Sequence, residues 1–120
     1  MSASPDLSGV FLRIKRHLDI PAVLTGDVRL CFALSGPGGG EWTLESADGG
    51  EVRRGLTSPC DCHLACTATD FLQLVDGRLA PRDGFLEGRL VVEGDVGLIL
   101  RLQRELIRLQ DAGTAVTVRR

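Results

Sequence analysis

The chain has 120 residues, of which 43% are hydrophobic and 25% are charged, and its formal net charge is −2. This length and composition are typical of one globular domain with a core of its own. There is no basic excess to indicate a nucleic-acid partner, and no apolar run approaches the roughly 18 residues that a membrane span needs. Residues 1–5 lack the charged-then-apolar pattern of a secretory signal. We therefore expect one cytoplasmic domain over residues 1–120, with its core at about 28–109.

The first half of the chain predicts one helix followed by strands. Apolar residues recur at helical spacing over residues 6–19, with Asp6 or Ser8 as candidate caps and Pro21 as the expected stop. Period-two alternation then predicts half-buried strands, separated by the glycine tract 36–40 and by a hairpin turn at residues 48–50. The four strands expected here cover residues 28–34, 41–46, 51–56 and 62–68.

The second half of the chain predicts mainly helices. Thr67 and Asp70 resemble a capping box, and Gly77 suits the end of the helix that they begin. Pro81 opens a short second helix that Gly88 closes. A fifth strand at 89–93 and a last helix at 96–109 follow, and the tail at 114–120 is expected to be mobile.

The last helix is apolar nearly all round in its first two turns, whereas a surface helix needs an apolar arc of only about 100°. Such a helix needs cover on two sides. The sheet is expected on one side, and a ligand, a partner chain or the N-terminal helix on the other. An ordinary buried core helix explains the pattern equally well.

The cysteines are expected to be free thiols, because thiols stay reduced in the cytoplasm. Cys60, Cys62, His63 and Cys66 form the one cluster of potential metal ligands, yet zinc needs ligands at about 2.0–2.3 Å. Along a strand the sulfurs of Cys62 and Cys66 start about 13 Å apart, and His63 points to the opposite face. We therefore predict neither a structural metal nor a disulfide framework that includes Cys31.

No residue pattern demands catalysis. The glycine tract 36–40 joins two strands and lacks the Lys-Ser/Thr of a phosphate-binding loop. No serine lies in a nucleophile elbow, and the histidines, His17 and His63, have no spacing that suggests a catalytic pair. Glu87, Glu93 and Asp95 flank the fifth strand without a recognisable arrangement. No cofactor and no catalytic residue are predicted.

A set of short motifs runs through the second half of the chain in a characteristic order. They are Asp61-Cys62, Asp70-Phe71-Leu72-Gln73-Leu74-Val75-Asp76-Gly77-Arg78-Leu79-Ala80-Pro81, Gly84-Phe85-Leu86-Glu87-Gly88-Arg89-Leu90-Val91-Val92-Glu93-Gly94-Asp95, and Gly97-Leu98, Leu100 and Arg101-Leu102-Gln103. With the glycine tract and Trp42 as a first hairpin, this set resembles the sterol carrier protein type two family over about Val28 to Leu109. The arginine-rich, lysine-poor composition suggests a free-standing bacterial member.

The resemblance implies an α+β fold, with a five-stranded, mostly antiparallel sheet covered on one face by helices. An apolar tunnel is implied between these layers, and family members bind sterols, fatty acyl chains, acyl-coenzyme A or other lipids there. Members usually lack catalytic residues. Carried over by position, the residues expected to line the tunnel are Trp42, Phe71, Phe85, Leu86, Leu100, Leu102 and Gln103. Gln103, the polar member of this set, would then be available to a ligand head group.

Two other classes of function stay open at this point. The chain could be a small enzyme that uses the tunnel as its active site in secondary metabolism, or an interaction subunit whose apolar last helix packs on a partner, including a homodimer. The first helix carries Arg13, Lys15 and Arg16 beside its apolar stripe, a pattern that fits transient membrane contact as well as an ordinary solvated face. Binding and transfer of an apolar ligand explains the apolar last helix and the missing catalytic residues together.

Overall fold

The computed structural model describes residues 7–57 and 59–111. Its strands are β1 Arg29–Ser35, β2 Gly40–Glu45, β3 Glu51–Arg54, β4 Cys62–Thr67 and β5 Val91–Gly94. Its helices are α1 Leu7–His17, α2 Ile20–Val23, α3 Ala68–Asp76, α4 Pro81–Leu86 and α5 Val96–Asp111, with a short 3₁₀ turn, η1 Ala47–Gly49, between β2 and β3.

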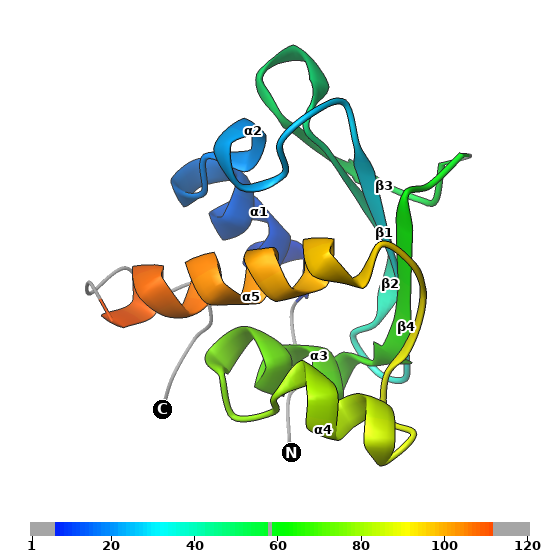
Figure 1. The fold of residues 1–120 in the computed structure, drawn as a ribbon. Coiled ribbons are helices and arrows are strands. Elements are labelled where there is room, and N and C mark those ends of the chain that lie inside the picture. Colours follow the sequence, from blue (N-terminus) through cyan, green and yellow to red (C-terminus); the bar gives the residue numbers. More distant parts are fainter. Residues whose placement is uncertain (1–6, 58, 112–120) are drawn as a thin grey trace.

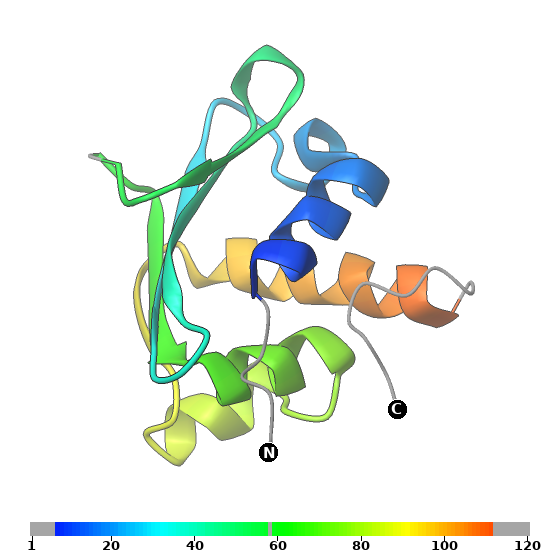
Figure 2. The ribbon, with the colours of Figure 1, turned by 180° about the vertical axis from the view of Figure 1, so that it is seen from behind.

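The five strands form one sheet in the order β3-β2-β1-β4-β5. β1 and β4 are parallel, and the other three pairings are antiparallel. The helices all lie on one side of the sheet (Figures 1 and 2). The α+β class and the five-stranded, mostly antiparallel sheet covered on one face are confirmed.

The face of the sheet beneath the helices is apolar because the strands keep their alternation in register. Phe32 on the central strand β1 lies opposite Trp42 on β2 and Leu64 on β4. Leu30 lies opposite Leu44 and Cys62 in the same way. These side chains are buried and form the base of the core. Since side chains in a strand alternate between faces, a shift of one residue would turn this whole set towards solvent.

An aromatic cluster joins the helical layer to the sheet. Phe11 on α1, which has 0% exposure, stacks on Trp42 with ring centroids 4.6 Å apart. It also stacks on Phe71 of α3 at 5.4 Å and meets Phe32 edge-on at 5.4 Å. Aromatic pairs in these geometries contribute beyond the area they bury. One residue of α1 therefore contacts aromatic rings on β1, β2 and α3.

The first helix ends earlier than the sequence predicts. α1 stops at His17, and Pro21 lies in the first turn of a separate helix, α2, that begins at Ile20. Proline is well tolerated in a first turn, because the N–H groups there have no partner within the helix. Pro21 therefore starts a helix and does not end one. The candidate cap Ser8 lies inside α1, and Asp6 falls outside the described residues.

β3 and β5 are each two residues shorter at one end than the alternation predicts, and each has a backbone reason; β2 and β4 end one residue early, at Glu45 and Thr67. β3 ends at Arg54 because Gly55 has a φ of 94°, and Leu56 beyond it is exposed. β5 begins at Val91 because the N–H groups of Arg89 and Leu90 donate to the carbonyl oxygen of Gly84 in α4, at 2.8 and 3.1 Å.

The predicted boundaries of α3 are confirmed in detail. The backbone N–H of Asp70 donates to the Thr67 side chain at 3.0 Å, which caps the start of the helix. Gly77 follows the last residue with a φ of 83°, the left-handed conformation that favours glycine at a helix end. The tail predicted to be mobile, 114–120, lies outside the described residues.

The expectation that all the cysteines are free is wrong for two of them. Cys31 and Cys60 form a disulfide, with their Cα atoms 6.4 Å apart, whereas Cys62 and Cys66 are free and buried. Cys31 lies on the face of the sheet away from the helices, and the segment joining β3 to β4 carries Cys60 to it. The Asp61 carboxylate helps to position that segment by accepting from the Arg29 backbone N–H at 2.8 Å. Only the folded chain brings together two cysteines 29 positions apart.

We predict that Phe11→Ala lowers the free energy of unfolding by about 3–5 kcal/mol, because it leaves a cavity among three aromatic rings. The matched control is Leu12→Ala, the next position of α1, which is 62% exposed. This control is expected to stay within about 0.5 kcal/mol of the unsubstituted protein. Urea unfolding measures both. Equal costs for the two substitutions would contradict the aromatic cluster as the anchor of α1.

Thiol titration with a chromogenic disulfide reagent tests the cysteine assignment. Burial raises the pKa of Cys62 to about 11 and that of Cys66 to about 12, so both stay protonated and unreactive at neutral pH in the folded protein. We expect no rapid reaction in the native state and two reactive thiols after unfolding. All four cysteines should react when the protein is unfolded and reduced. Four reactive thiols in denaturant without reductant would disprove the Cys31–Cys60 bond.

Candidate functional site

An apolar hollow lies between the sheet and the helices α3 and α5. Its walls are buried or half-buried, and all but one are apolar: Phe32, Phe71, Leu74, Val75, Ile99, Leu102, Gln103 and Leu106. The free volume is only about 10 Å³. That is at the lower limit of space for one water molecule, so the layers are closed on each other in this structure.

The structure brings three of the seven predicted wall residues to this hollow. Phe71, Leu102 and Gln103 line it. Trp42 is buried one layer away, where it stacks on Phe11 and carries the Arg54 guanidinium 4.6 Å from the centre of its ring.

The other three predicted wall residues lie elsewhere. Phe85 packs on the edge of the core, while Leu86 is 76% exposed and Leu100 is 43% exposed. Their role in binding stays a prediction. The carry-over by position missed wall residues on β1, α3 and α5, although helical and strand periodicity place them on the inner face and Leu74 and Val75 belong to the quoted motifs. These are Phe32, Leu74, Val75, Ile99 and Leu106.

The Gln103 amide bonds to the last turn of α3 and to the segment that follows it. Its Nε2 group donates to the carbonyl oxygens of Leu74 and Leu79, each at 2.9 Å. Gln110, two turns further along α5, donates to the carbonyl oxygen of Val75 at 2.9 Å. The end of a helix leaves carbonyl groups without partners in the helix. Gln110 bonds to such a group at Val75, while the Leu74 carbonyl oxygen accepts from the Gly77 backbone N–H as well as from Gln103. The two glutamines therefore tie α5 to the end of α3 along one side of the hollow.

A second polar cluster fixes the position of α4 and β5 beside α3. The Arg89 guanidinium donates to the Asp70 carboxylate at 2.8 Å and to the Gln73 amide oxygen at 2.7 Å. It also pairs with Glu87 at 3.3 Å. Asp70, Gln73 and Arg89 belong to the motifs that carry the family resemblance, and their role in this structure is to hold α3 against the chain that enters β5.

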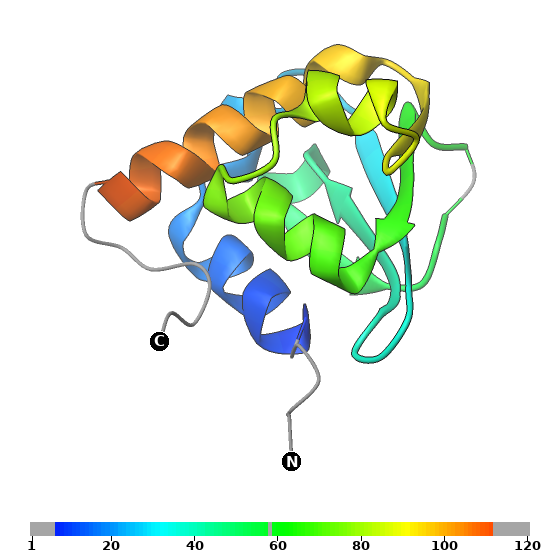
Figure 3. The ribbon, with the colours of Figure 1, turned by 90° about the horizontal axis from the view of Figure 1, so that it is seen from below.

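The second side of α5 is only partly covered. α5 runs across the middle of the helical layer, with α1 and α2 above it and α3 and α4 below it in the views of Figures 1 and 2. Figure 3 shows the same layer from below, with α3 beside the sheet. Leu98, Ile99, Leu102 and Leu106 are buried, while Leu100 is open. The first turns of α5 are therefore covered by the sheet and the other helices at Leu98, Ile99 and Leu102, and they are open to solvent at Leu100.

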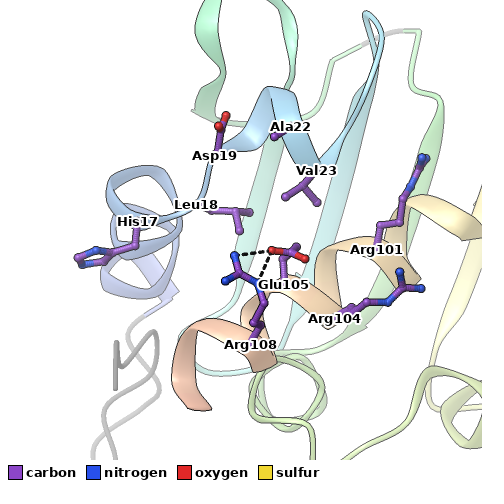
Figure 4. A pocket seen from close by; sticks show the side chains of 9 residues that line it. All are labelled: His17, Leu18, Asp19, Ala22, Val23, Arg101, Arg104, Glu105 and Arg108. Carbon is purple, nitrogen blue, oxygen red and sulfur yellow. Dashed lines mark hydrogen bonds and ion pairs between the residues drawn. The ribbon is translucent and has the colours of Figure 1, made fainter. Parts of the chain in front are cut away.

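An open cleft of about 430 Å³ separates the corner between α1 and α2 from α5 (Figure 4). One wall comes from the corner and one from α5, and together they comprise His17, Leu18, Asp19, Ala22, Val23, Arg101, Arg104, Glu105 and Arg108. Leu18 and Val23 form a buried apolar floor. The sequence pattern did not single out this cleft, although the spacing of Arg101, Arg104 and Arg108 puts them on one helix face.

The other groups considered from the sequence are a metal cluster, the cysteine thiols and the basic face of α1. Within residues 7–57 and 59–111, no three His, Cys, Asp or Glu side chains are grouped closely enough to hold a metal ion. Cys60 is bonded to Cys31, and the buried thiols of Cys62 and Cys66 have raised pKa values. On α1, Lys15 pairs with Glu51 of β3 at 3.1 Å, so one of the three cations considered for membrane contact is engaged within the fold. No helix in the described part of the chain is long and apolar enough to cross a bilayer.

Comparison with known proteins identifies the class to which this sheet and helical cover belong. The solution structure of sterol carrier protein domain 2 of Helicoverpa armigera superposes with a TM-score of 0.65 at 19% identity, covering 90% of this chain and 96% of that one. Palmitated SCP2L2 from Aedes aegypti gives 0.62 at 18% identity, covering 84% and 94%. Both show the shared fold.

Sequence comparison then assigns the family. Residues 22–106 match the profile of the SCP-2 sterol transfer family. Hydroxysteroid dehydrogenase-like protein 2 of Xenopus laevis is 34% identical over 106 residues, which is 87% of this chain and 25% of the frog protein. The chain thus spans about a quarter of the length of that relative. It belongs to the SCP-2 sterol transfer family, whose domains bind apolar lipid ligands.

We predict that Gln103→Leu destabilises the protein by about 1–3 kcal/mol, because it removes two hydrogen bonds worth roughly 0.5–1.5 kcal/mol each. Arg104→Leu, at the next position of α5, is the control, since Arg104 is exposed and leucine has a similar helix propensity. The free energy of unfolding in urea measures both. If Gln103→Leu costs no more than the control, the amide does not hold α5 to α3.

Proposed function

We propose that this chain binds an apolar, lipid-like ligand between its sheet and its helices and transfers or presents that ligand without chemical conversion. The observation that carries the proposal is the hollow between β1, α3 and α5. Its lining is apolar apart from Gln103, and it lies at the centre of the layer interface. Membership of a lipid-binding family supports the same conclusion.

The closed state of the hollow defines what binding requires. Ligand sites usually measure roughly 300–1,000 Å³, whereas this hollow measures about 10 Å³. A ligand can therefore enter only if α5 moves away from α3 or the sheet. The contacts that resist this movement are the amide hydrogen bonds of Gln103 and Gln110 to α3. Binding then shifts the protein towards an open state that the ligand prefers.

A fatty acyl chain is the ligand that we propose to test first. The structural neighbour from Aedes aegypti is palmitated, and the hollow offers apolar surface with a single amide. Sterols stay a second candidate, on the strength of the family description. Trp42 is a natural reporter, since it is the sole tryptophan and stacks on Phe11, which also stacks on the wall residue Phe71.

The experiment compares two leucines of α5 that differ in burial. Leu102 lines the hollow and is 4% exposed, whereas Leu100 is 43% exposed. A phenylalanine at 102 occupies the space that the ligand needs. Overfilling a packed site costs about 1–3 kcal/mol. Since this cost opposes ligand entry in Leu102→Phe, the affinity of that variant for dodecanol or dodecanoate should fall roughly 5- to 150-fold. Leu100→Phe should leave the affinity unchanged.

Titrations followed by Trp42 emission measure these affinities, and thermal unfolding checks them, because a ligand that binds only the folded state raises its stability. Circular dichroism confirms that both variants fold. The proposal fails if the unsubstituted protein shows no change in emission or in melting temperature with either probe. It fails equally if Leu100→Phe and Leu102→Phe weaken binding to the same extent.

A further inference from the structure

The cleft between the α1–α2 corner and α5 carries charge that the fold does not use. Among the described residues, Arg101 and Arg104 take part in no ion pair or hydrogen bond. Their neighbour Arg108 is paired with Glu105, from its Nη2 atom at 2.7 Å and its Nε atom at 2.9 Å. In Figure 4 this pair lies on α5, below Leu18 in the view. Two guanidinium groups are thus left free within one cleft.

Most other arginines of the described chain are engaged. Arg29 and Arg53 pair with Glu45, and Arg89 pairs with Asp70. Arg16 and Arg82 also lack partners in the described part of the chain, but both are exposed and neither lines the cleft. The unpaired positive charge in the cleft contrasts with the chain as a whole, which has a net charge of −2.

The floor of the cleft adds a second requirement for its ligand. Leu18 and Val23 are buried and apolar, and Ala22 lies beside them. At 3.6 residues per turn, the cleft residues of α5 and those that line the hollow, such as Leu102 and Leu106, project from different faces of the helix. The cleft and the hollow are therefore distinct, with α5 between them.

We propose that this cleft is a second binding site, which takes a phosphate or carboxylate group attached to a short apolar body. The guanidinium fork matches the geometry of both anions, and Arg101 and Arg104 supply it. The apolar body covers Leu18, Ala22 and Val23. The volume of about 430 Å³ lies within the usual range for small-molecule sites. This site goes beyond the proposed function, which concerns the hollow.

The other titratable groups of the cleft act on the ligand in predictable directions. Asp19 is a carboxylate that pairs with no cation among the described residues, so it opposes a bound anion. Glu105 is neutralised by Arg108. His17 lies at the edge, with its ring pointing away from the other lining side chains in Figure 4. Removal of the Asp19 charge should therefore strengthen binding.

The test uses octyl phosphate, octanoate and octanol, with affinities measured by titration calorimetry at low ionic strength. The unsubstituted protein should prefer the two anions to octanol about tenfold, equivalent to about 1.4 kcal/mol. The double variant Arg101→Gln/Arg104→Gln should lose this preference and keep its affinity for octanol. Arg16→Gln/Arg82→Gln removes the same charge outside the cleft and should retain it. Asp19→Asn should increase the preference, and added salt should reduce it.

Three outcomes would overturn the second site. The first is an equal preference in the two double variants. The second is loss of octyl phosphate binding in Leu102→Phe, which would place this probe in the hollow. The third is that Arg101→Gln/Arg104→Gln keeps the preference but no longer sediments with phosphatidylglycerol vesicles, which would assign these arginines to a membrane surface. Failure of the proposed function gives a different result. In that case Leu102→Phe has no effect on the binding of any apolar probe, while the preference for anions persists.

Discussion

The structure depends on the packing of Phe11 against rings from three other elements. α1 has no hydrogen-bonded ladder to join it to the sheet. Its position rests on the stacks of Phe11 with Trp42 and Phe71, on the burial of Leu7, Val10 and Ile14, and on Lys15, which donates to the Gly50 carbonyl oxygen at 3.2 Å and to Glu51 at 3.1 Å. Phe71 in turn lines the hollow. Because protein interiors are close-packed, displacement of Phe71 by a ligand cannot leave Phe11 and Trp42 unaffected. The same contact that stabilises the fold therefore connects the hollow to α1.

α5 has a different relation to each of its neighbours, and this asymmetry bears on function. Towards α3 it is tied by the amides of Gln103 and Gln110 over an apolar seam. Towards α2 it is separated by a cleft that is already open. Movement of α5 towards the cleft would widen the hollow, and it would break these hydrogen bonds, each of modest net strength, together with the apolar contacts of Ile99, Leu102 and Leu106.

The disulfide on the other face of the sheet stabilises a region that no helix covers. Cys31 is fully buried although it points away from the helical layer, because the segment carrying Cys60 crosses over it. This bond lies on the central strand, opposite Phe32 and the hollow. The sheet is therefore packed against the helices on one face and crossed by a disulfide-bonded segment on the other.

The sequence by itself determined the order of the elements, the apolar face of each strand and the caps of α3, since period-two alternation and local capping depend on neighbours in the chain. The short motifs determined the family for the same reason. Only the tertiary structure decided which predicted wall residues meet: Leu102 and Leu100 have the same side chain two positions apart, yet one lines the hollow and the other faces solvent. It also decided the role of Pro21, the Cys31–Cys60 bond, the use of the Gln103 amide by α3, and the cleft lined by Arg101 and Arg104. Each of these depends either on residues brought together from distant segments or on which neighbours cover a given face. The local spacing of residues in the sequence determines neither condition.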